Sequence, residues 1–340
     1  MREPARPAWR RYAEPVFLFA LLFVPLFTDK YTQYVCNLVL VYALVGIGLN
    51  LLLGYAGQFA FAHAAFMGIG AYSAALLTTR LGVPFWISLP AAGLVAMIIG
   101  AIAVLPALRM KRVYLALATI AFAELVTWVL VHWKAVTLGT DGVDLKAPYF
   151  FGWRIGSDNT KYFVLLVVTA IMYLFAKRIL QSKIGRAFVA IRENEIVAQC
   201  NGIDVARTKT IAFALSAFYA GIGGALFALT LGFIVPDGFG LGQIALHFSI
   251  VVIGGLASLP GSLIGAVLVT ILPEALRGLQ GVQELVYGLT LMLFILFMPS
   301  GIAGLLRKYS LLPREILAAP GWREQTSGHR HAGASAKAAE

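Results

Sequence analysis

Three ionisable side chains lie within long apolar stretches of the sequence: His63, Glu124 and His247. Each is a candidate functional group, because moving a charge into the centre of a bilayer costs about 3 kcal/mol or more. Carriers driven by an ion gradient usually need more than one such group, and these stretches contain no pair of Asp or Glu residues. A role for Glu124 in a transport path or in coupling is therefore a hypothesis, and a hydrogen bond to a neighbouring helix is the alternative.

Uncharged polar side chains accompany His63 in the same apolar run. Asn50, Tyr55 and Gln58 stand within or directly beside it. Such groups can line an aqueous path, or they can hydrogen-bond between packed helices. Both interpretations stay open, so Asn50, Tyr55, Gln58, His63 and Glu124 are candidates for the translocation path.

The local signatures of enzymes and of nucleotide binding are missing. No Gly-Lys pair occurs, which excludes the usual phosphate-binding loop, and neither His-Glu-x-x-His nor Gly-x-Ser-x-Gly is found. The only cysteines, Cys36 and Cys200, have no metal-ligand spacing and are interpreted as structural. We expect no enzyme activity, no cofactor and no metal, so active transport would need an ion gradient or a separate ATPase.

The composition places these residues in a membrane. Apolar residues make up 60% of the 340 and charged residues 13%, against about 25% charged in soluble domains. The sequence predicts an all-α polytopic protein with about ten transmembrane helices, or eight if the short first one and the interrupted run 238–273 do not span fully. The expected helices are 15–29, 31–53, 57–79, 84–107, 113–134, 161–179, 209–232, 241–259, 261–276 and 283–299.

The net charge of +11 is better explained by membrane orientation than by nucleic acid. Most of the 27 Lys and Arg residues fall at the two termini and in alternate connections, which predicts that both termini are cytoplasmic. The expected organisation is a cytoplasmic segment 1–14, a transmembrane domain 15–306 and a polar, disordered cytoplasmic tail 307–340.

The longest predicted cytoplasmic connection, 177–209, contains an amphipathic helix. Its apolar residues recur at helical spacing, and Gly202 is well placed to end the helix. Arg192, Glu193 and Glu195 lie in its middle, and acidic groups are unfavourable on anionic lipid. A protein partner is therefore favoured over the membrane surface.

Four segments give the chain a family resemblance from about residue 40 to 305, in which the sequence resembles the permease subunits of branched-chain amino-acid ABC importers. They are GLNLLLGYAGQFAFAHAAFMGIGAY at 48–72, TLGTDGV at 137–143, SKIGRAFVAIRENEIVAQCNGIDVARTKTIAFALSAFYAGIGGALFA at 182–228 and IVVIGGLASLPGSLIGAVLV at 250–269. The resemblance implies an ABC importer permease architecture in which the helix 184–202 couples to an ATPase, through Arg192, Glu193, Glu195, Ala198 and Gly202. The sequence departs from the usual Glu-Ala-Ala-x-x-x-Gly pattern, because its acid stands one position early, at Glu195.

The resemblance also implies partners and a location. These are a homologous second permease, two ABC ATPase subunits that use ATP and Mg²⁺, and a periplasmic protein that delivers leucine, isoleucine or valine, all at a bacterial inner membrane. Gly139, Asp141 and Gly142 form a turn-rich candidate for docking the binding protein. The residues leave three alternatives open: a permease for urea, short amides or other amino acids, a stand-alone ion-coupled carrier, and a structural membrane scaffold.

Overall fold

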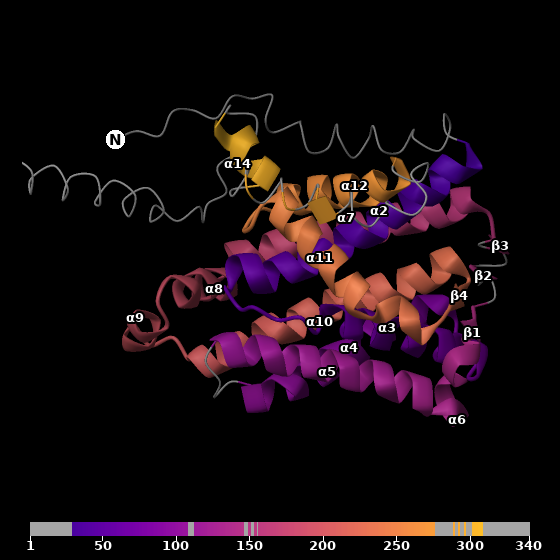
Figure 1. The fold of residues 1–340 in the computed structure, drawn as a ribbon, viewed down its shortest axis with the longest axis horizontal. Helices are drawn as coiled ribbons and strands as arrows, with labels where there is room; N and C mark the ends of the chain where they lie inside the picture. The colour runs from indigo at the N-terminus through magenta and orange to yellow at the C-terminus, as the bar shows by residue number, and fades with distance from the viewer. Residues whose placement is uncertain are drawn as a thin grey trace, which may run out of the picture.

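The computed structural model is a bundle of long helices that run side by side, with two short helices projecting from one end (Figure 1). It describes residues 29–107, 112–145, 149–150, 153–154, 156–275, 288–289, 292, 296 and 301–308. The expected helix 15–29 and the segment 1–14 fall outside these residues. The expected helix 283–299 and the tail 307–340 do so almost entirely.

Helices account for nearly all of the described chain. In sequence order they are α2 (Lys30–Leu49), η1 (Asn50–Tyr55), α3 (His63–Thr79), α4 (Phe85–Ala107), α5 (Arg112–His132), α6 (Lys134–Thr137), η2 (Gly139–Asp141), α7 (Asp158–Gln181), α8 (Lys183–Glu193), α9 (Glu195–Cys200), α10 (Val205–Leu231), η3 (Pro236–Phe239), α11 (Leu241–Gly254), α12 (Leu259–Ala275) and α14 (Gly301–Lys308).

Six of the described helices are long and apolar enough to cross a membrane. This confirms the prediction of an all-α multi-pass protein, because a spanning helix needs about 20 apolar residues. The total of eight to ten crossings stays a prediction. The six stretches are Lys30–Tyr55, Phe85–Leu105, Tyr114–His132, Asp158–Gln181, Val205–Leu231 and Pro236–Gly254.

Helix α10 forms the centre of the bundle and packs against α2, α3 and α4. Small residues make this close packing possible. A Cβ atom on Gly224 would collide with the backbone of Met67, and one on Gly70 would collide with the backbone of Gly221. Helix backbones that approach so closely gain van der Waals contact, which replaces the hydrophobic drive that is absent between helices in lipid.

The expected helix 57–79 is wrong in its first turn and a half, because α3 begins only at His63. The preceding helix ends in a π-helical turn, η1, and residues 57–61 have no regular structure. Gly57 has a φ of +67°, a conformation that an α-helix does not contain and that glycine adopts without steric cost. Irregular backbone at membrane depth is tolerated where protein covers it, and Ala56, Gln58 and Ala60 are buried.

Helices α11 and α12 form a tight hairpin, in which α11 belongs to the candidate span Pro236–Gly254 and α12 is a shorter apolar helix. Helix α11 ends at Gly254 and helix α12 begins at Leu259, with a turn at 255–258 between them. Helix α11, with 14 residues, is about 21 Å long, so it approaches the thickness of the hydrocarbon core, about 30 Å, only together with η3. Glycine again permits the contact, since a Cβ atom on Gly265 would meet the backbone of Ile250 and Gly254.

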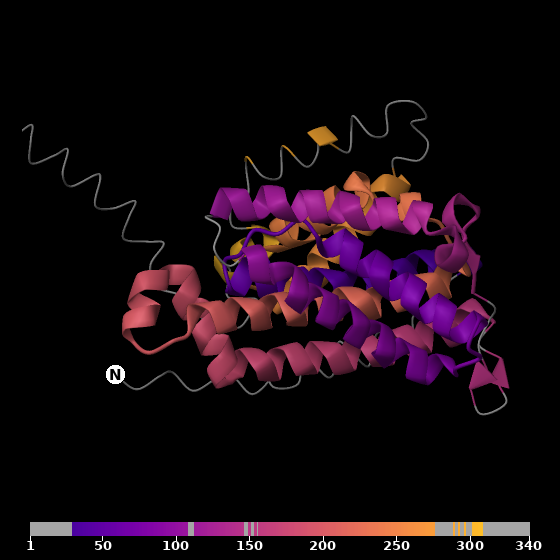
Figure 2. The same ribbon diagram turned by 90° about the horizontal axis from the view of Figure 1, so that it is seen from below.

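Short β-ladders lie at the end of the bundle opposite α8 and α9 (Figures 1 and 2). Strand β1 (Val143–Asp144) pairs antiparallel with β4 (Phe233–Ile234), with Val143 opposite Ile234. Strands β2 (Tyr149–Phe150) and β3 (Trp153–Arg154) form a second antiparallel pair. The first ladder ties the connection after α5 to the connection after α10.

Candidate functional site

The predicted helix 184–202 is two helices, and this corrects the expectation of one. Asn194 adopts an extended conformation between α8 and α9, with φ of −160° and ψ of 115°. Its side-chain oxygen accepts hydrogen bonds from the backbone N–H groups of Ile196 at 2.9 Å and Val197 at 3.2 Å. Asparagine is among the best N-cap residues, so it ends one helix and begins the next. Together α8 and α9 project from the bundle (Figure 2).

Glu195 points back toward the bundle. Its Oε2 atom accepts a hydrogen bond from Lys209 Nζ at 2.8 Å, and the lysine side chain is only 11% exposed. Lys209 belongs to α10, so this ion pair fixes the first turn of α9 to the central helix. The geometry therefore gives Glu195 a partner within its own chain.

We expect Glu195→Arg to lower the thermal midpoint of the purified protein and its transport activity together. The substitution puts two cations side by side and removes a charged hydrogen bond worth roughly 1.5–3 kcal/mol. The doubly exchanged variant Glu195→Lys with Lys209→Glu restores the pairing and is expected to recover most of both quantities. Recovery of the midpoint without transport would instead show that Glu195 contacts a partner directly.

Two aliphatic side chains are exposed on α9. Ile196 is 73% exposed and Val197 is 55% exposed, and Glu193, just before the break, is exposed as well. Ala198 faces inward and is 3% exposed. Two neighbouring exposed aliphatic side chains at the tip of a projecting helix make this surface a candidate for a protein contact.

Gly202 ends α9 as the sequence predicts. Its φ is +80°, and its N–H donates to the Gln199 carbonyl while the N–H of Ile203 donates to the Ala198 carbonyl. This pair of bonds is the Schellman motif, which requires a left-handed residue just after the helix. Gly202 therefore sets the direction in which the chain returns to α10.

Arg192 connects α8 to the interruption between η1 and α3. We call this interruption, residues 56–62, the break, and the helices on its two sides the broken helix. Its Nη1 donates to the Gly54 carbonyl at 2.6 Å, and its side chain packs over Gly57, where a Cβ atom would lie 2.9 Å from Arg192 Cγ. The carbonyl of Gly54 is one of those that the end of η1 leaves without an intrahelical partner. Arg192 is therefore a direct contact between the projecting helices and the membrane-spanning bundle.

Asn50 is completely buried, at 0% exposed, and joins η1 to the α11–α12 turn. Its Nδ2 lies 2.9 Å from the Ser258 carbonyl, 2.8 Å from Ser262 Oγ and 3.3 Å from the Gly255 carbonyl. Its Oδ1 accepts from the N–H of Ala257 at 2.9 Å. That turn is strained, because Ala257 has a φ of +56°, and Asn50 holds it in place.

The other polar candidates of this region are buried around the break. Tyr55 is 2% exposed and Gln58 is 1% exposed, and Gln58 Nε2 donates to the Ala56 carbonyl at 3.2 Å. His63 Nε2 lies 3.0 Å from the Val45 carbonyl, so it donates there, and Nδ1 accepts from Ser216 at 3.1 Å. His63 thus joins α2, α3 and α10.

A second histidine packs against the first. The His63 and His247 rings meet edge to face, with centroids 5.6 Å apart, and His247 Nε2 lies 3.2 Å from Gln243 Nε2. Gln243 also reaches the Tyr42 hydroxyl at 3.3 Å. The structure thus brings together two histidines that are 184 positions apart.

Glu124 is separate from this buried group. It lies on the exposed side of α5, as do Leu125 at 57% and Trp128 at 58% exposure. Within the part of the chain that the structure describes, Glu124 makes no hydrogen bond or ion pair. Sequence position alone did not distinguish it from the buried candidates.

The docking candidates lie at the far end, in a well-defined turn. Gly139 and Gly142 have φ of +63° and +73°, and Asp141, between them in sequence, is exposed. Thr137 Oγ1 donates to the Leu130 carbonyl at 2.7 Å, which folds this turn against α5.

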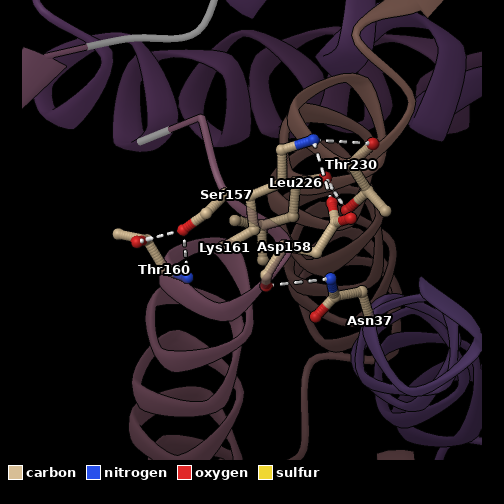
Figure 3. Close-up of polar contacts among 7 residues, drawn as sticks. All are labelled: Asn37, Ser157, Asp158, Thr160, Lys161, Leu226 and Thr230. Atoms are coloured by element: carbon tan, nitrogen blue, oxygen red, sulfur yellow. Dashed lines mark hydrogen bonds and ion pairs between the residues drawn. The ribbon is translucent and has the colours of Figure 1, made fainter. Parts of the chain in front are cut away.

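The same end is tied together across α2, α7 and α10 (Figure 3). Lys161 Nζ donates to the Thr230 carbonyl at 3.2 Å and pairs with Asp158 at 3.6 Å. Asn37 Nδ2 donates to the Asp158 carbonyl at 3.4 Å. These contacts hold α2, α7 and α10 together at the end of the bundle that carries the Asp141 turn.

Sequence reasoning missed Ile196, Val197 and Lys209. The apolar pair directly after an Asn-Glu capping sequence is a local signal that could have indicated an exposed α9 tip. The partnership of Lys209 with Glu195 has no local signal, because it depends on how the chain returns after Gly202.

These features define a multi-pass, all-α membrane protein. The sequence matches the family described as the permease component of branched-chain amino acid transport systems over residues 31–298, and the chain belongs to this family.

Three named permeases show the extent of the similarity. The high-affinity branched-chain amino acid transport system permease protein LivM of Escherichia coli (strain K12) is 31% identical over 86% of this chain and 76% of its own. The LivH permease protein of the same strain is 30% identical over 77% and 91%. The ribose import permease protein RbsC of Haemophilus influenzae is 25% identical over 69% and 73%. No solved structure matches the chain.

Proposed function

We propose that this chain is a transmembrane permease subunit of an ATP-driven importer for leucine, isoleucine and valine. The observation that carries the proposal is the family match over residues 31–298, together with 31% identity to LivM. The exposed apolar tip of α9 supports it, because a permease that lacks a phosphate-binding loop needs a surface through which an ATPase can act.

The proposed assembly contains this chain, a second homologous permease, two cytoplasmic ABC ATPases and a periplasmic binding protein. Relatives named LivM and LivH both match the chain, which supports a pair of different permeases. The ATPases use ATP and Mg²⁺, and this chain binds neither. The complex would lie in the bacterial inner membrane, with both termini and the α8–α9 end in the cytoplasm.

At the cytoplasmic end, α8 and α9 form the coupling element. The ATPase contacts the exposed tip of this element, at Glu193, Ile196 and Val197. Arg192 and Glu195 act inside the chain and transmit the movement to η1 and α10. Ala198 and Gly202 shape α9 itself.

The translocation path runs beside the broken helix. Asn50, Tyr55, Gln58 and His63 hold the break in position from within the protein, whereas Glu124 lies away from them on the exposed side of α5. At the outer end the turn of Gly139, Asp141 and Gly142 contributes to the docking surface for the binding protein. Movement of α8 would change the shape of the path at Gly57.

The test is uptake and partner recovery with the tagged chain, purified from its native membrane. We expect a second permease and ATPase subunits to co-purify, and leucine uptake to require ATP. Ile196→Asp should reduce ATPase recovery at least about tenfold, since burying a carboxylate without a partner is unfavourable. Cys200→Ser, on the same helix and exposed, should leave ATPase recovery unchanged.

Other outcomes would overturn the proposal in specific ways. If the chain is recovered alone and still transports solute after reconstitution, it is a stand-alone carrier. If the complex assembles but takes up urea or a short amide in preference to leucine, the substrate assignment is wrong and the importer assignment stands.

A further inference from the structure

One helix of the bundle presents a charged residue where the hydrocarbon of the membrane should be. Glu124 lies ten residues after Tyr114 and eight before His132, the ends of an apolar span. At 1.5 Å per residue it is about 15 Å from one end and about 12 Å from the other, near the middle of a core about 30 Å thick. Its side chain is exposed.

The residues around Glu124 form one outward face of α5. Exposed residues recur every three or four positions along α5 and therefore lie on one side of the helix. We call this set of residues the α5 stripe. Tyr114, Leu117 and Trp128 are each between 58% and 63% exposed. The stripe consists of Tyr114, Leu117, Ala121, Glu124, Trp128 and His132.

Helix α5 is also the least buried of the six candidate spans. Of its 18 most apolar consecutive residues, 22% are buried, against 78% in the spans Lys30–Tyr55 and Val205–Leu231. It runs along the outside of the bundle in both ribbon views (Figures 1 and 2). Its inner side packs on α3, through Ala123 against Ala64 and Ala65, so among the described residues the stripe is the side of α5 left uncovered.

The exposed faces of two other helices have a different composition. On α4 the exposed large side chains include Leu94, Ile98 and Ile102, and on α7 they include Val167 and Ile171. None of these carries a charge or a hydrogen-bonding group, so they suit lipid. A carboxylate that faced lipid would cost about 3 kcal/mol or more, so the stripe must meet something else.

We propose that the α5 stripe is the surface against which the second permease subunit packs, and that Glu124 faces a water-filled path between the two subunits. This inference rests on the proposed function, which supplies the second permease. Tyr and Trp on the stripe are typical of protein interfaces, and Ala121, one turn before Glu124, lets a neighbouring helix approach closely. Water on the path side would solvate the carboxylate and remove the cost of facing lipid.

The first experiment places a photoreactive phenylalanine analogue at single positions in the intact complex. Substitution at Leu117 or Ala121 is expected to give a covalent adduct with the second permease. Substitution at Ile98 of α4 or Ile171 of α7, which are equally exposed, is expected to give at least about tenfold less. Adducts from α4 or α7 in place of α5 would overturn the proposed interface.

The second experiment tests the path. In the complex with Cys36→Ser and Cys200→Ser, the variant Glu124→Cys is expected to react with a charged, membrane-impermeant thiosulfonate at least about tenfold faster than Ile102→Cys. Equal, slow reaction at both positions would place Glu124 away from water and contradict its assignment to a path.

The two proposals fail in distinguishable ways. If no second permease is recovered with the chain, the proposed function itself is wrong. If the second permease is recovered but cross-links through another face, the importer assignment stands and only the interface is wrong.

Discussion

Arg192→Ala is expected to reduce ATP-dependent uptake by about tenfold or more while the assembled complex continues to hydrolyse ATP. The guanidinium donates to the Gly54 carbonyl at 2.6 Å and covers Gly57. A hydrogen bond to a charged group contributes roughly 1.5–3 kcal/mol, and 1.4 kcal/mol corresponds to a factor of ten. Without it, movement of α8 no longer reaches the break. Uptake and ATP hydrolysis are measured on the same reconstituted complex.

Arg186→Ala is the matched control for this prediction. Arg186 lies on the same helix and is exposed, so its removal takes away a cation without touching the bundle. We expect uptake within about twofold of the unmodified protein, as for most exposed substitutions. If the two alanine variants lose uptake equally, Arg192 has no special role in coupling.

Asn50→Leu is expected to destabilise the protein by roughly 3–5 kcal/mol, the largest effect on stability among these variants. Leucine has a similar size but cannot replace the contacts to Gly255, Ala257, Ser258 and Ser262. Each buried polar group left without its partner costs about 1–3 kcal/mol. The measurement is the thermal midpoint in detergent, which should fall by several degrees.

Asn201→Leu provides the comparison for Asn50. It makes the same chemical change at an exposed residue whose amide bonds only to its own helix, at the Val197 carbonyl. The expected loss is below about 0.5 kcal/mol. A similar midpoint for the two variants would mean that Asn50 does not hold the α11–α12 turn.

These two residues belong to one series of contacts. Arg192 joins α8 to the end of η1, and Asn50, at the start of η1, joins it to the turn at 255–258. A displacement of α8 can therefore reach α11 and α12 through six residues of π-helix. Such irregular turns occur frequently at functional sites.

The sequence predicted most helices of the bundle well. The ranges 84–107 and 113–134 correspond closely to α4 and α5, because a long apolar run has only one stable structure in lipid. The sequence-based prediction was less accurate at residues 57–62, where the uncharged apolar run continues although the helix has ended. Gly57, which has a positive φ, packs against Arg192, which is 135 positions away in the chain.

In the candidate site, too, some features were predicted correctly from the sequence and others were not. Gly202 was predicted correctly as a helix terminator, because capping depends on neighbouring residues. The single helix 184–202 was wrong, since its apolar periodicity continues across Asn194 although the backbone does not. Glu195 and Glu193 look equivalent in sequence, yet Lys209 pairs only with Glu195.

By itself the sequence determined the membrane class, the approximate positions of most described helices, the family and the location of the segment that projects as α8 and α9. Those features follow from local composition, spacing and motif content. The tertiary structure alone decided which polar groups are buried, that Arg192 contacts Gly54, and that Glu124 is exposed on α5. The physical reason is that burial and pairing depend on segments far apart in the chain, which come together only when the helices pack.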